Sequence, residues 1–308
     1  MSLKQLSDTD GTKYADGTNA ELTTLGKDVW MKLPKFYYKA ENIPDSFKPN
    51  YLWTITFKYG SQFEEGELDG FKEWDGKDLI GVYKAYSDDQ GLYSVSGVTP
   101  TGSKTPTEFI NLAQARGNGF SLVKLKHHSI MGFLFYALYT NTNCQAIVGS
   151  GTSTSRKTTG ATNALSMEDT SASTNGNSQS INFWGLENWW GDAYETICNV
   201  VAAESTFEIT EDDGSIRTIT KHPRGGYINR ILIGSNLDLI CADNLSGGSS
   251  TTYFCDHAGV MATGDMLRRS YNSNKEDGGV ACMSSTTSTW SSENSCTRLC
   301  YRGDYVII

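Results

Sequence analysis

Cysteine and histidine side chains offer the widest chemistry in this sequence, because both bind metal ions and both take part in catalysis. The 308-residue chain holds seven cysteines and four histidines, at Cys144, Cys198, Cys241, Cys255, Cys282, Cys296 and Cys300 and at His127, His128, His222 and His257. They form no CxxC pair, no paired Cys/His spacing typical of zinc and no HExxH motif. We therefore predict no metal site and no cofactor, and interpret most of the cysteines as small buried residues.

The first residues, MSLKQLSDTDGTKYADG, contain no apolar stretch of the length that a signal peptide needs. No later segment has the ~18 consecutive apolar residues of a membrane span. We therefore expect synthesis in the cytoplasm and no membrane insertion. Cys296 and Cys300 are close enough in the sequence to pair if the backbone allows it, but cysteines made in that compartment usually stay reduced.

Glu187 and Glu195 could be a carboxylate pair for general acid and base chemistry, since both lie in one short segment that also holds three tryptophans. The alternative role is to accept hydrogen bonds from indole or backbone donors in the core, and we favour it. The sequence has no GxSxG elbow, no glycine-rich phosphate loop and no dinucleotide fingerprint. We expect a protein that is not an enzyme.

The segment 181–201, INFWGLENWWGDAYETICNVV, must position these two acids. Gly185 and Gly191 bracket its tryptophans and indicate tight turns or a close approach between backbones. Residues 193–201 then have the pattern of a strand that enters a core.

Two helices are expected before this segment. Thr105, Pro106 and Glu108 form the pattern of a capping box and predict a helix from 106 that ends before Gly117. A short strand at 120–124 follows. A second helix carries one apolar stripe that we expect to lie on a core, formed by Ile130, Phe133, Leu134, Ala137 and Leu138. His127 and His128 at its start are interpreted as surface or capping residues.

Three segments carry a resemblance to a known family. GLENWWGDAYE, at 185–195, is similar to the "GL.D..GN..EW" signature of the C-type lectin fold in its formylglycine-generating-enzyme-like branch. This branch includes phage tail proteins and receptor-binding proteins that are diversified by retroelements, and the GLENWW form is most similar to proteins of gut-bacterial phages and prophages. Residues 111–138 resemble the first helix, short strand and second helix of the family, and TRLCYRGDY, at 297–305, resembles its closing strand.

The resemblance implies an α+β fold of the C-type lectin type, with two helices around a twisted, mostly antiparallel sheet. Alternating apolar residues at 51–59 indicate a half-buried strand in the part that precedes the resemblance. We therefore expect a small β-rich N-terminal domain at 1–100 and a lectin-like ligand-binding domain at 101–308.

The enzymes of the same branch bind copper through a cysteine pair near the C terminus, so the resemblance makes an oxidase of that type an alternative. The candidate pair is Cys282 with Cys296 or Cys300, but Cys282 and Cys296 are 14 positions apart, whereas the family spacing is short. The chain also has LVKLKHHSI where the enzymes have an acidic LPTEAEWE-type segment. We do not expect this activity.

Tyrosine, tryptophan, serine and asparagine gather near the C terminus, the mixture that antibody paratopes use for binding. The segment 284–297 has ten Ser or Thr among 14 residues around a single tryptophan. The predicted ligand-binding residues are Tyr253, Asp256, His257, Arg269, Tyr271, Asn272, Asn274, Trp290, Ser292 and Asn294, with Arg268 beside them. The alternative is a polar surface whose few aromatic residues complete the core.

The net charge of −9 and the lack of a basic cluster exclude nucleic acid as an expected partner. We expect a non-enzymatic phage or prophage receptor-binding or tail-associated protein that binds a bacterial surface protein or glycan. Such a protein is associated with the virion and its tail proteins, and proteins of this kind are often homotrimers. The alternative function is a structural virion decoration or fibre protein.

Overall fold

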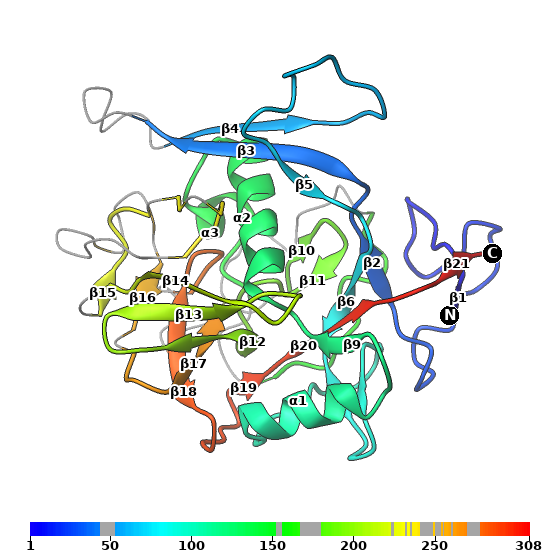
Figure 1. Cartoon of the computed structure of the whole chain (residues 1–308). Helices are drawn as coiled ribbons and strands as arrows, with labels where there is room; N and C mark the ends of the chain where they lie inside the picture. Colours follow the sequence, from blue (N-terminus) through cyan, green and yellow to red (C-terminus); the bar gives the residue numbers. More distant parts are fainter. Residues whose placement is uncertain are drawn as a thin grey trace.

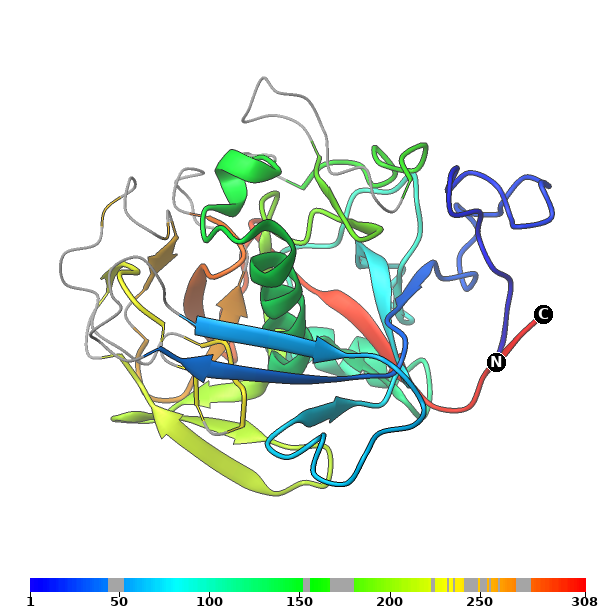
Figure 2. The same ribbon diagram turned by 90° about the horizontal axis from the view of Figure 1, so that it is seen from above.

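The structure is a computed structural model. It describes residues 1–43, 53–151, 156–166, 180–222, 225–231, 233–234, 236–240, 249, 254, 256–259, 261–269 and 278–308. The helix α2 runs through the middle of the molecule, and sheets lie around it on several sides (Figure 1). The two termini lie side by side at the periphery, because β1 pairs with β21 (Figure 2).

Three helices occur in this part of the chain: α1 (Pro106–Gln114), α2 (Leu125–Tyr139) and α3 (Cys144–Ile147). The predicted capping box of α1 is confirmed. The Thr105 side chain accepts a hydrogen bond from the backbone N–H of Glu108, and the Glu108 carboxylate accepts one from the backbone N–H of Thr105. Two of the N–H groups that a helix start leaves without a partner are satisfied in this way.

The largest sheet has eight strands in the order β14-β13-β12-β17-β18-β16-β15, with β19 paired to β12 outside this path. Its strands are β12 (Tyr194–Ala202), β13 (Thr206–Thr210), β14 (Ile216–Thr220), β15 (Gly226–Tyr227), β16 (His257–Ala258), β17 (Asp265–Arg269), β18 (Met283–Thr287) and β19 (Ser295–Cys296). The strand β12 confirms the prediction for 193–201.

Two further sheets enclose the other sides of α2. One has the order β2-β6-β20-β9, with β2 (Trp30–Lys32), β6 (Asp78–Lys84), β20 (Arg298–Arg302) and β9 (Phe120–Leu122). The other has the order β4-β3-β5, with β3 (Phe36–Asn42), β4 (Trp53–Lys58) and β5 (Lys72–Trp74), and it lies across one end of α2 (Figure 2).

Three two-stranded sheets complete the described strands: β1 (Ser2–Leu3) with β21 (Val306–Ile307), β7 (Tyr86–Ser87) with β8 (Leu92–Tyr93), and β10 (Asn182–Phe183) with β11 (Leu186–Glu187). In β4 the apolar side chains are half-buried and the threonines between them are exposed. This alternation confirms the prediction of a half-buried strand.

The expected fold class, two helices around a sheet, is wrong. Strands account for 33% of the residues and helices for 11%, so the molecule is mostly β, and its strands form a curled half-barrel. The two expected helices exist, but they are short, and α2 is surrounded by strands instead of covering the face of a sheet (Figure 1).

The burial of α2 gives the physical reason for this error. Every residue from Ile130 to Tyr136 is buried, whereas Ala137 and Leu138 of the predicted stripe are exposed. The predicted stripe covers only one side of the helix, whereas Met131, Phe135 and Tyr136 place buried side chains on its other sides. A helix that is apolar all round lies inside a protein. His127 and His128 are buried as well, so they do not lie on the surface, but His127 caps α2 as the alternative prediction had it, because its Nδ1 accepts a hydrogen bond from the Lys124 N–H.

The expected boundary at residue 100 stays a prediction. In the structure β6, which precedes the boundary, pairs with β20 near the C terminus, and β20 pairs with β9. The two expected domains therefore share one sheet. Among the described residues, no helix is long and apolar enough to cross a membrane.

Candidate ligand-binding face

The segment 287–294 links β18 to β19 and is held from two sides. The Thr107 hydroxyl at the start of α1 donates to the Ser288 carbonyl at 3.2 Å, and the Ser103 N–H donates to the Ser292 carbonyl at 2.8 Å. From the other side, the N–H of Tyr194 donates to the Asn294 carbonyl at 2.8 Å. These contacts fix the backbone of a segment that has little apolar surface to bury, so the backbone is held in place before any ligand arrives.

Trp290 is the exposed centre of this segment. Its side chain is 49% exposed, and its ring lies 5.3 Å from the guanidinium carbon of Arg268. The Tyr194 ring lies 4.1 Å from the same guanidinium carbon. Both distances are within the range of a cation–π contact, so Arg268 joins the two aromatic rings.

Arg268 is itself held by hydroxyl groups. It lies opposite Ser284 in the β17–β18 register, and its two Nη atoms donate to the Ser295 hydroxyl at 2.9 Å and the Ser284 hydroxyl at 3.2 Å. We call Tyr194, Arg268, Ser284 and the segment 287–294 the Trp290 face.

The structure brings some of the predicted site residues together and not others. Trp290, Ser292 and Asn294 lie on the Trp290 face, where Trp290 and Asn294 are exposed and Ser292 is half-buried. His257 lies on β16, half-buried, with its ring 5.6 Å from that of Tyr227. The remaining aromatic and amide residues of the prediction, Tyr253, Tyr271, Asn272 and Asn274, lie outside the described residues.

The prediction needs correction at Asp256 and Arg269, because both side chains are fully buried. Arg269 donates to the carbonyls of Leu239 and Val280, and the Ala281 N–H donates to the Asp256 carboxylate at 3.3 Å. Both side chains therefore satisfy backbone groups inside the protein and do not reach an exposed ligand. Tyr194 was not among the predicted site residues. It stands at the start of a strand, and no pattern in the sequence shows that its side chain stays half-exposed.

A buried ionic cluster supports this face from below. The Glu195 carboxylate accepts hydrogen bonds from Arg298 Nε at 3.1 Å and Lys84 Nζ at 3.2 Å, and His128 Nε2 lies 3.4 Å from it. Burial alone would raise the pKa of Glu195, but Arg298 and Lys84 hold it well below its usual value. Burial lowers the pKa of His128 to about 4, so this ring is neutral near pH 7.

Glu187 has the structural role that we favoured. Its carboxylate accepts hydrogen bonds from the backbone N–H groups of Gly160 and Thr162, and burial raises its pKa. Nearby, Gly191 has φ +76° and packs so closely on Gly151 that a Cβ on Gly191 would lie 2.9 Å from the Gly151 Cα. Glu195 is structural as well, but its donors are the side chains of Arg298 and Lys84, not the indole or backbone donors that were predicted.

Asp78, His127 and Cys300 form a buried trio that resembles both a metal site and a catalytic triad, since their candidate ligand atoms lie within 4.8 Å of one another. His127 Nε2 lies 3.4 Å from Asp78 Oδ2 and 3.5 Å from Cys300 Sγ. Its Nδ1 accepts a hydrogen bond from the Lys124 N–H at 2.8 Å. In the neutral ring, the proton must therefore be on Nε2.

That proton argues against both kinds of chemistry. A histidine that binds a metal through Nε2 normally donates a hydrogen bond from Nδ1, whereas here Nδ1 accepts one. An Nε2 that already carries a proton also cannot take the proton of Cys300, whose pKa is raised by burial. Although burial opposes it, the pKa of Asp78 is held well below its usual value by His127 and Lys126. The trio fits a structural role.

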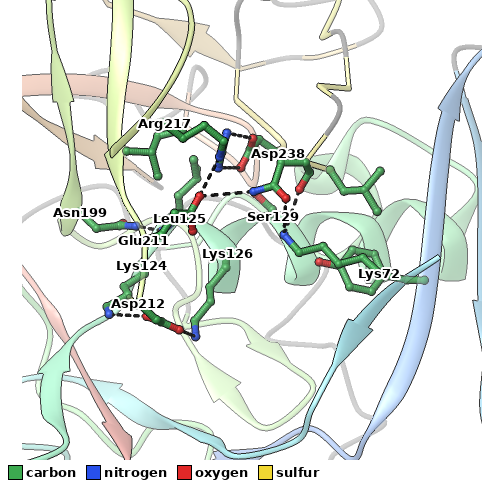
Figure 3. Close-up of a pocket in the computed structure, with 14 residues that line it drawn as sticks. Lys72, Lys124, Leu125, Lys126, Ser129, Asn199, Glu211, Asp212, Arg217 and Asp238 are labelled. Atoms are coloured by element: carbon green, nitrogen blue, oxygen red, sulfur yellow. Dashed lines mark hydrogen bonds and ion pairs between the residues drawn. The ribbon is translucent and has the colours of Figure 1, made fainter. Parts of the chain in front are cut away.

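A charged crevice lies between the start of α2, β13 and residues 236–238 (Figure 3). It encloses about 360 Å³, including space that is open to solvent. Of its four cations, Lys72 donates to the backbone and side-chain carbonyl oxygens of Asn236, and the other three are paired with carboxylates: Lys124 and Lys126 each lie 2.6 Å from Asp212, and Arg217 contacts Glu211 at 2.7 Å. These pairs leave little unsatisfied charge for a ligand.

Comparison with known proteins adds no further assignment. No protein-family model matches this chain, and no curated protein matches it.

Proposed function

We propose that this chain is a non-enzymatic ligand-binding protein and that the Trp290 face is its recognition surface. The observation that carries the proposal is the half-exposed indole of Trp290, which is held over a guanidinium by a backbone segment fixed at both sides. Single exposed apolar residues are common on proteins. An exposed tryptophan flanked by hydroxyl and amide side chains is the composition of a binding surface.

The sequence resemblance supplies the biological setting of the proposal. Following it, we propose a receptor-binding or tail-associated protein of a phage or prophage whose ligand is a molecule on the bacterial surface. Binding then depends on exchangeable side chains on a fixed frame. The buried cluster of Glu195, Lys84 and Arg298 supports this view, because it holds β12, β6 and β20 together beneath the face.

The test compares two exposed apolar residues, one in the segment 287–294 and one on β14. Trp290→Ala removes the proposed anchor, and Ile216→Ala, at a side chain that is 67% exposed on β14, is the matched control. Binding of the labelled full chain is measured on a panel of bacterial cells and on their isolated surface polysaccharides. We expect Trp290→Ala to weaken binding at least about tenfold, as for an interface anchor, with an unchanged melting temperature.

Equal binding by both variants and the unaltered chain would place recognition elsewhere. Absence of binding to every cell type and polysaccharide would favour the structural role, a virion decoration or fibre protein.

A further inference from the structure

Arg268 is a buried cation without a carboxylate partner among the described residues. Its side chain is 7% exposed, and within this part of the chain no Asp or Glu lies within ion-pair distance of its guanidinium. Asp265, on the same strand, is held by Ser285 and the Ala262 N–H, and its charge acts on Arg268 only from beyond ion-pair distance. Buried charges are normally paired, because loss of hydration is costly.

The hydrogen bonds of Arg268 leave part of its capacity unused. A guanidinium has five N–H groups, and two of those of Arg268 donate to the hydroxyls of Ser284 and Ser295. The Nε atom has no partner among the residues that the structure describes. Hydroxyls and ring faces stabilise the cation but do not neutralise it.

A second arginine lies beside the same segment. Arg156 Nη1 donates to the Pro100 carbonyl at 2.6 Å, and its Nε has no partner in the described part of the chain. Gly102 lies between this guanidinium and the segment, since a Cβ on Gly102 would be 2.7 Å from Arg156 Nε and 2.7 Å from the Glu293 carbonyl oxygen. Two cations without a described acidic partner therefore flank residues 290–295, in a chain whose net charge is −9.

The other features of the face favour a sugar over a peptide. Short hydroxyl and amide side chains flank Trp290 along the segment 287–294, and they match the hydroxyl groups of a saccharide, while the flat indole matches the C–H face of a sugar ring. An extended peptide would need a free strand edge or a groove. The strand β18 pairs with β17 along its whole length, and on its other side it pairs with β16 at Met283 alone, so among the described strands only the short edge at residues 284–287 is open to a peptide.

We propose that the Trp290 face binds an acidic saccharide, with the carboxylate of a uronate or sialate unit against Arg268 and the sugar ring against Trp290. This inference rests on the proposed function and names its ligand class. Arginine suits the role because its planar fork binds both oxygens of a carboxylate.

Isothermal titration calorimetry on the full chain tests the inference with uronate- and sialate-containing oligosaccharides. Each is paired with its carboxyl-reduced counterpart, which keeps the ring and loses the charge. We expect at least one acidic oligosaccharide to bind, and its reduced form to bind at least about tenfold more weakly, as the loss of a charge-assisted contact implies. Arg268→Gln should bind both forms alike, and Trp290→Ala should weaken both.

Two further variants test whether a loss of binding comes only from the change in net charge or from misfolding. Lys27→Gln removes one positive charge from an exposed ion pair with Glu21 and should leave binding unchanged. Arg268→Lys keeps the charge without the fork and should lose part of the affinity, and it replaces Arg268→Gln if that variant fails to fold in a thermal melt.

Several results would overturn the inference. If reduced and acidic forms bind equally but Trp290→Ala abolishes binding, the face recognises its ligand and only the acidic class is wrong. Trp290-dependent binding to bacterial cells without binding to any oligosaccharide, or tighter Trp290-dependent binding of a poly-glutamate peptide, would also exclude the acidic saccharide. Oligosaccharide or cell binding that is unaffected by Trp290→Ala would contradict the proposed function itself.

Discussion

Arg298 is the residue on which the frame beneath the Trp290 face depends most. Its side chain is fully buried and donates to Glu195 and to the carbonyls of Gly81, Val82, Glu187 and Asn188. It therefore links β6, β11 and β12 from its position on β20. A planar group with five fixed donors suits this place, and a lysine could not reach the same set of acceptors.

Removing Arg298 should destabilise the fold strongly, because Glu195 would keep a buried charge with fewer partners. We expect Arg298→Ala to reduce the free energy of unfolding by about 3–5 kcal/mol. Lys27→Ala, which breaks an exposed ion pair with Glu21, should reduce stability far less, because solvent screens an exposed pair. Urea unfolding followed by tryptophan fluorescence measures both changes. Equal losses would show that burial does not determine how much an ion pair contributes to the free energy of unfolding.

His128 should make stability depend on pH in a mildly acidic range. Its folded pKa of about 4 lies below the usual 6.5, so the unfolded chain binds this proton first. Stability is present above pH 6.5 and is lost as the pH falls toward 4. Burial lowers the pKa of His127 in the same direction. The lowered pKa values of Asp78 and Glu195 contribute only below the usual range of a carboxyl group, whereas the pKa of Glu187, which burial raises, acts with the opposite sign above that range.

Between pH 6.5 and pH 5 we expect His128 to account for a loss of about 2 kcal/mol, from 1.36 kcal/mol per pH unit and proton. His128→Gln keeps a polar side chain that does not titrate and should flatten the dependence. Urea midpoints at the two pH values give the comparison. The same slope in both proteins would mean that His128 is already protonated in the folded state near pH 5.

At the level of elements, α1 connects the fold to the candidate site, since the segment 287–294 is bonded to Thr107 in its first turn. Its capping box was predictable because the pattern is local and acts through two adjacent hydrogen bonds. The strands β4 and β12 were predictable for the same reason, as alternation and apolar runs are local signals.

The cap of α1 should contribute measurably to stability. Thr105→Ala removes the side chain that accepts from the Glu108 N–H, and we expect a loss of about 1 kcal/mol. Gln114→Ala, at an exposed position in the last turn, should change stability by less than about 0.5 kcal/mol. Thermal melts of the two variants test the assignment, which fails if Thr105→Ala melts with the unaltered protein.

What the sequence did not reveal depends on contacts between distant residues. The pairing of β6 with β20 joins residues more than 200 positions apart, and no local pattern records it. The burial of Asp256 and Arg269 has the same origin, because a charged residue on a strand gives no sign of which backbone carbonyls will surround it. The exposure of Trp290 could be predicted, because a lone tryptophan in a serine- and threonine-rich segment has too few apolar neighbours to be buried.

At the scale of the whole molecule, the sheets enclose α2, and the segment 287–294 extends from the end of β18 at the periphery (Figure 1). The rigid part of the protein is thus the mostly β frame, and the candidate recognition surface is a short segment fixed to it. This arrangement separates stability from binding, so surface side chains can change without loss of the fold.

Hydrogen–deuterium exchange of the full chain, with and without a bound bacterial surface ligand, tests this account most directly. We predict that the ligand slows exchange in peptides that cover 283–295 and the start of β12. Protection confined to the crevice between α2 and residues 236–238, with 283–295 unchanged, would contradict the assignment of the Trp290 face.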